Sequence, residues 1–81
     1  MENNSSERIL ADLKDGESGI ITSIAGGKKV TKRLADLGLK AGTRITVIRK
    51  TLFSGPAQVE VCGSRLVIGQ GMASKITVLP K

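Results

Sequence analysis

The chain has 81 residues, the length of one small domain. Thirteen Lys and Arg residues against seven Asp and Glu residues give a net charge of +6, which favours an acidic partner: nucleic acid, an anionic membrane surface or an acidic protein face. The absence of histidine and the presence of a single cysteine, Cys62, exclude the common metal-binding clusters, a Ser–His catalytic pair and an internal disulfide.

The beginning of the chain predicts a tail followed by a short strand. Residues 1–8 are polar and aperiodic, and we expect them to be disordered. Residues 9–13 form a short apolar lead with one helical turn, and Asp15 with Gly16 is a turn signal. Residues 18–24 read as the first strand, whose imperfect alternation indicates a β-bulge.

One helix is predicted, over about residues 31–37. Val30, Leu34 and Leu37 recur at the spacing of one helical face, so we expect all three to be buried. Gly38 follows the last apolar position, where a residue with positive φ usually ends a helix. Leu39 should then pack back onto the final turn, as in a Schellman ending.

Four further strands are predicted over residues 44–50, 57–61, 64–68 and 75–79, with a 3₁₀ turn near residues 72–74. The chain is therefore all-β: a small barrel of about five strands with one short inserted helix. The core must consist of Ile, Leu and Val, because Phe53 is the only aromatic residue.

The clearest hairpin has its turn at Cys62 and Gly63. A two-residue loop there sets Val59 opposite Leu66 on the core face, and it sets Glu60 opposite Arg65 on the outer face. The turn could be type I′ or type II, and a four-residue loop would preserve the same faces.

The sequence offers no catalytic constellation, so we expect no enzyme activity, no cofactor and no tight metal site. Asp12, Asp15 and Glu17 surround a predicted turn, where solvated carboxylates are the simplest interpretation. We interpret Cys62 as an inert, partly buried thiol.

No apolar run approaches the roughly 20 residues of a membrane span, and the first residues lack the features of a signal peptide. We therefore expect a cytoplasmic protein that does not insert into a membrane.

The candidate partner-binding residues are Lys29, Arg33, Leu52 and Phe53. Lys29 and Arg33 belong to a basic helix face, for which a merely solvated surface is the alternative interpretation. Leu52 and Phe53 belong to a loop, where they either cap a barrel end or form an apolar contact. Binding of nucleic acid is the alternative function, although Phe53 alone cannot provide the aromatic platforms that single strands require.

The order and spacing of several short motifs resemble the FeoA family of bacterial ferrous iron uptake. The resemblance spans nearly the whole chain, and its pieces are residues 10–13, Gly16 with Ile21, residues 33–39, Gly42 with residues 45–47, Gly55 with Pro56, residues 59–61 with Gly63, and Ala73 with residues 76–78. It implies an SH3-like barrel and an accessory role beside FeoB, the membrane transporter for Fe(II) with a cytoplasmic GTP-binding domain. Residues 69–72 depart from the family pattern, so the resemblance does not predict the conformation of the turn there.

Overall fold

The structure of the protein is a computed structural model that describes residues 7–50 and 55–81. In chain order, its elements are β1 (Arg8–Ile9), the 3₁₀ turn η2 (Leu10–Asp12), β2 (Ser18–Ile24), α1 (Lys28–Asp36), β3 (Arg44–Lys50), β4 (Ala57–Val61), β5 (Ser64–Ile68), α2 (Gln70–Ala73) and β6 (Ile76–Pro80). The mainly β architecture predicted from the sequence is confirmed.

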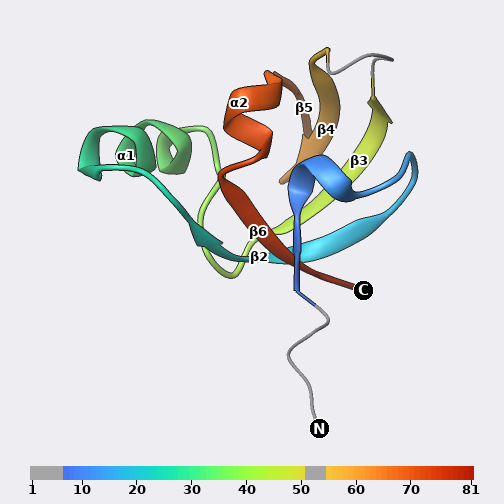
Figure 1. Cartoon of the computed structure of the whole chain (residues 1–81), viewed down its shortest axis with the longest axis horizontal. Coiled ribbons are helices and arrows are strands. Elements are labelled where there is room, and N and C mark those ends of the chain that lie inside the picture. The colour runs from blue at the N-terminus through green and yellow to red at the C-terminus, as the bar shows by residue number, and fades with distance from the viewer. Residues whose placement is uncertain (1–6, 51–54) are drawn as a thin grey trace, which may run out of the picture.

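All of these strands join one antiparallel sheet in the order β1-β6-β2-β3-β4-β5. The sheet curves, with η2 and α2 at one end and α1 to one side (Figure 1). Alternate residues of the strands point inward, so the core is aliphatic, as expected. Its members are Leu10, Leu13, Ile21, Leu34, Leu39, Ile45, Val47, Ala57, Val59, Val61, Ile68, Ala73, Ile76 and Val78.

The bulge predicted in the first strand is present. The register of β2 with β6 shifts between Ile21 and Ser23, so Thr22 is the extra residue. The hydroxyl of Thr22 donates a hydrogen bond to the carbonyl oxygen of Thr77 at 3.2 Å. The bulge therefore keeps a polar contact with β6 where the regular ladder is interrupted.

At the N-terminal side, the boundary of the predicted tail was wrong by one residue. Arg8 pairs with Val78 and belongs to β1, because the outer backbone of β6 accepts a further short strand. The predicted helical turn is confirmed as η2, which buries Leu10, and Leu13 directly after it is fully buried. Residues 1–6 of the predicted tail lie outside the described residues.

Helix α1 ends as predicted. Gly38 has φ +93°, the N–H of Gly38 donates to the oxygen of Ala35 at 2.9 Å, and the N–H of Leu39 donates to the oxygen of Leu34 at 2.8 Å. These two bonds define a Schellman ending. Leu39 is fully buried, as expected of the residue that packs back.

Two helix predictions were wrong. Leu37 is 53% exposed rather than buried, because it lies at the C-cap, where the chain already turns away from the helical face. Instead of a 3₁₀ turn, the structure has the α-helical turn α2, in which the N–H of Ala73 donates to the oxygen of Gly69 at 2.9 Å. Gly69, with extended backbone, is the N-cap, and the helix starts at Gln70, two residues earlier than predicted.

The β4–β5 hairpin has the predicted register. Val59 lies opposite Leu66, Glu60 opposite Arg65 and Val61 opposite Ser64. Cys62 has φ 54° and Gly63 has φ 80°, and two positive values identify a type I′ turn. The type II turn and the longer loop are therefore excluded.

Candidate interaction surface

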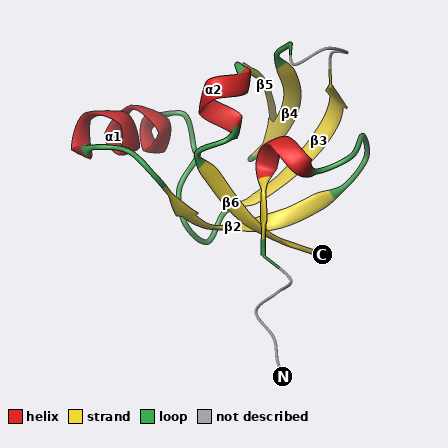
Figure 2. Cartoon of the chain, viewed as in Figure 1, coloured by secondary structure: helices red, strands yellow, loops and turns green. Residues whose placement is uncertain are grey.

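The basic face of α1 is exposed and unneutralised. Lys28, Lys29, Lys32 and Arg33 are all exposed on this helix, which stands at one side of the molecule (Figure 2). Within residues 7–50 and 55–81, no carboxylate forms an ion pair with any of them. The helix therefore presents concentrated positive charge to solvent.

An apolar groove lies beside this basic face. We call it the α1–β5 groove; it has a volume of about 260 Å³ and is lined by Arg33, Leu34, Leu37, Leu39, Leu66, Val67, Ile68, Gly69 and Met72. Two of its lining residues, Leu37 at 53% and Val67 at 71%, are the exposed large hydrophobic residues among those described. The groove is thus an apolar hollow between α1, the edge strand β5 and α2.

Of the four predicted partner-binding residues, Lys29 and Arg33 lie close together in the structure. Arg33 lines the α1–β5 groove, and with Lys29 it also lines an adjoining hollow that reaches Val30 and Met72. Leu52 and Phe53 lie outside the described residues. The sequence analysis did not identify Leu37 or Val67, although Val67 gave a signal as an apolar residue on the outward face of a predicted strand.

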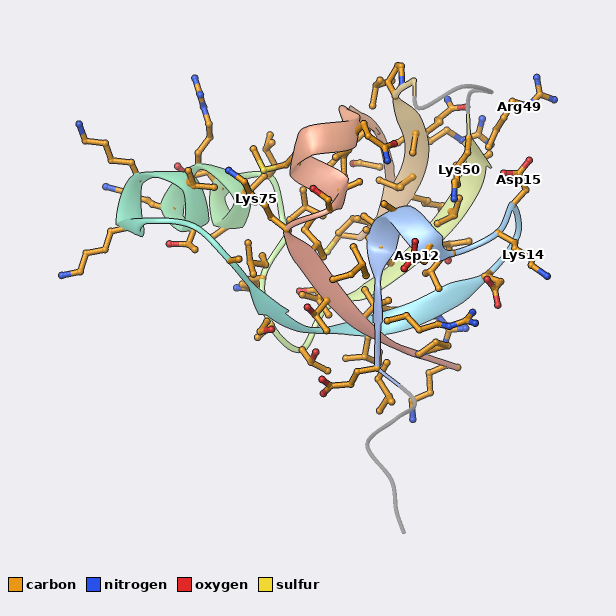
Figure 3. All side chains as sticks on the ribbon, in the orientation of Figure 1. Asp12, Lys14, Asp15, Arg49, Lys50 and Lys75 are labelled. Atoms are coloured by element: carbon orange, nitrogen blue, oxygen red, sulfur yellow. The ribbon has the colours of Figure 1, made fainter. Side chains whose placement is uncertain are left out.

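The carboxylates near the first turn have structural partners. An Asp15 carboxylate oxygen accepts the backbone N–H of Lys50 at 2.9 Å, and a Glu17 carboxylate oxygen accepts the N–H of Lys14 at 2.6 Å. Figure 3 shows Asp15 and Lys50 on neighbouring segments. In the part of the chain that the structure describes, no three His, Cys, Asp or Glu residues gather as metal ligands would.

Cys62 was predicted to be partly buried, and this was wrong. Its thiol is exposed, because Cys62 occupies the tip of the type I′ turn rather than a strand position. Across the described ranges, none of the helices is long and apolar enough to cross a membrane.

Comparison with known proteins defines the class of this fold. The structure superposes on an FeoA iron uptake regulatory protein with a TM-score of 0.86 at 31% identity, covering 93% of this chain and 99% of the other. It also matches the zinc complex of FeoA from Stenotrophomonas maltophilia, a prokaryotic SH3 domain protein, with a TM-score of 0.74; at 20% identity over 89% and 93% of the two chains, this match shows the fold alone. The chain is therefore an SH3-like domain.

The sequence comparisons then give the family. The FeoA domain model matches residues 9–80. The candidate Fe(2+) transport protein A of Methanocaldococcus jannaschii is 38% identical over 69 residues, which are 85% of this chain and 82% of that protein. The chain belongs to the FeoA family, whose members are non-enzymatic accessory proteins of ferrous iron transport.

Proposed function

We propose that this FeoA-family protein is a cytoplasmic adaptor that promotes ferrous iron uptake by contacting the cytoplasmic face of an FeoB-like transporter. The single observation that carries the proposal is the exposed basic face of α1, together with membership of a transport family. A surface with unneutralised positive charge attracts an acidic protein face and accelerates its association.

The proposed contact residues are Lys29, Arg33, Leu52 and Phe53. Arg33 provides charge at the α1–β5 groove and Lys29 at the adjoining hollow, and Leu52 and Phe53, which lie outside the described residues, are expected to provide apolar side chains. This combination of apolar anchors with a charged rim is typical of protein interfaces.

The test is a pull-down with the cytoplasmic domain of FeoB at increasing salt, combined with an iron uptake assay. Alanine at all four positions should weaken both capture and uptake, and salt should weaken capture by the unaltered protein because exposed charges are screened. The control carries Arg44→Ala and Lys75→Ala, which remove exposed charges from other parts of the fold. Normal uptake by a folded quadruple variant would contradict the proposed interface.

The same preparation tests the alternative function, binding of nucleic acid. Affinities for random duplex and single-stranded oligonucleotides, measured across a salt series, should be weak and should not discriminate between sequences. Tight binding to either oligonucleotide without capture of the transporter domain would replace the adaptor proposal.

A further inference from the structure

The outer edge of β5 has unpaired backbone groups. The type I′ turn makes Val61 and Ser64 a hydrogen-bonded pair, so the pairs that exchange hydrogen bonds are Val61 with Ser64 and Val59 with Leu66. Ala57 with Ile68 is the next pair of this kind, so the intervening residues Arg65 and Val67 direct their N–H and C=O groups away from β4. Elsewhere in the described chain, no backbone or side-chain group hydrogen-bonds to these two residues.

The α1–β5 groove lies along this edge. Leu66, Val67 and Ile68 of β5 form one wall, and residues of α1 form the other. The interior is apolar because Leu34, Leu37 and Met72 contribute to it. An extended segment placed here would extend the sheet and bury alternate side chains in the hollow.

Basic side chains outnumber acidic ones around the groove. Arg33 and Lys29 lie on the α1 side, and Arg65 lies on the β5 side. Arg65 is opposite Glu60 in register, yet the two side chains form no ion pair. Asp36, on α1, is the acidic residue that follows Arg33 by one helical turn, and it too forms no ion pair. The local balance therefore favours an acidic ligand.

We propose that the α1–β5 groove binds an extended acidic peptide segment, which adds as a seventh strand to the edge of β5. The N–H and C=O groups of Arg65 and Val67 hydrogen-bond to the added backbone. Apolar side chains of the segment enter the groove between α1 and β5, and its carboxylates, on the other face of the added strand, meet Arg65. The identity of the segment as part of the transporter rests on the function proposed above.

A second copy of this chain fits the edge less well. Pairing two β5 strands would bring two Arg65 side chains onto one sheet and would join two molecules that each carry a net charge of +6. Like charges across paired strands are destabilising.

A second hollow lies on the other side of α1 and cannot accept an added strand in the same way, because it contains no residue of either edge strand. Its lining residues are Ile24, Thr31, Lys32, Ala35, Leu39, Lys40 and Ala41.

The probe for this proposal is a seven-residue peptide in which valine and aspartate alternate. In the added strand, its valines face the groove and its aspartates face Arg65. Two control peptides accompany it: one with lysine in place of aspartate, and one with N-methylated amides at the positions that face β5. Each control should bind about tenfold more weakly or not at all, because one reverses the charge and the other removes the ladder donors.

The most specific readout is amide hydrogen exchange followed by NMR. Binding of the probe should slow exchange at Arg65 and Val67, whereas Leu66, which already bonds to β4, should change little. This alternating pattern is expected of strand addition and not of a side-chain contact alone.

Two protein variants test the same step. Val67→Pro removes the outward N–H, which an edge strand tolerates, and should weaken probe binding about tenfold, while Val67→Thr keeps the N–H and should bind within about twofold of the original protein. Leu37→Asp, at the exposed rim of the groove, gives an independent test if the proline variant is unstable.

Three outcomes would overturn the proposal. They are equal binding of the N-methylated probe, unchanged exchange at Arg65 and Val67, and a stable dimer formed through β5 in the absence of peptide. If the transporter domain binds without protecting these amides, the proposed function stands and the groove proposal fails. If the probe shows the alternating pattern but the transporter domain does not bind, the adaptor proposal fails and the groove still accepts an acidic strand.

Discussion

The two edges of the sheet are built differently. At one edge, β1 has only two residues, and the chain then folds into η2 and buries Leu10 and Leu13. The other edge, β5, has five residues and an exposed Val67. Proteins usually protect sheet edges by shortening or covering them, so a long open edge beside an apolar groove indicates a place for another chain.

A side chain from the middle of the sheet strengthens the closed edge. The Lys50 ammonium donates hydrogen bonds to the carbonyl oxygens of Ala11 at 2.5 Å and Leu13 at 2.6 Å. It thereby satisfies backbone groups around η2 that no strand pairs (Figure 3). Among the described residues, no side chain forms comparable hydrogen bonds to the outer backbone of β5. We therefore expect substitutions at the closed side to affect stability most, and substitutions at the open side to affect binding.

The largest loss of stability should come from Gly19→Ala on the closed side. A Cβ at Gly19 would lie 2.8 Å from the carbonyl oxygen of Leu79, so β2 and β6 would have to separate. We expect a loss of about 3 kcal/mol in the free energy of unfolding, measured by urea denaturation. Gly71→Ala is the matched control, since a Cβ there meets open space and should be neutral or slightly stabilising. Equal midpoints for the two variants would contradict the close approach of β2 and β6.

The next largest effect should come from Lys50→Met. The substitution keeps most of the aliphatic stem but leaves the carbonyl oxygens of Ala11 and Leu13 without their donor. We expect a loss of about 2 kcal/mol, with faster amide exchange around η2. Arg49→Met, at the exposed neighbouring position, should change stability by less than about 0.5 kcal/mol. If both variants lose the same free energy of unfolding, the two hydrogen bonds of the Lys50 ammonium do not stabilise the fold.

A smaller loss should follow Gly38→Ala, at the end of α1 beside the open groove. Its φ of +93° is unfavourable for a residue with a Cβ, so we expect a loss of about 1 kcal/mol. The thermal unfolding midpoint should fall accordingly, with Gly71→Ala again as the reference. An unchanged midpoint would argue against the left-handed helix ending.

The smallest effect should come from Cys62→Asn in the turn of β4 and β5. Asparagine accepts the φ of 54° more readily than cysteine does, so the variant should gain about 0.5 kcal/mol. Cys62→Val should instead lose stability, because a β-branched residue is strained at positive φ. Opposite signs for the two variants in urea denaturation would confirm the type I′ turn, and equal signs would refute it.

Features with a local cause could be predicted from the sequence. The register of the hairpin follows from the alternation around Cys62 and Gly63, and the helix ending follows from Gly38 and Leu39, which lie next to the residues that they bond or cover. The bulge in β2 was visible for the same reason, since the alternation itself is broken there.

The open edge and its groove could not be predicted, because they depend on contacts distant in sequence. The outward direction of Val67 follows from alternation, but β5 is an edge only because β6 pairs with β1 and β2 rather than with β5. Leu37 lines the groove only because the C-terminal end of α1 lies beside β5, a contact between segments about 30 residues apart in the chain. The bonds of Lys50 likewise join residues 37 and 39 positions apart.

The placement of β6 has a consequence for synthesis on the ribosome. β2 to β5 emerge first and can join as neighbours, but β2 lacks its second partner until Ile76–Pro80 have left the exit tunnel. Until then, the nascent chain has a seven-residue strand with one unpaired side, a template for misassembly with other chains. β6 is the strand that pairs with both β2 and β1, so neither pairing can form before Ile76–Pro80 are available.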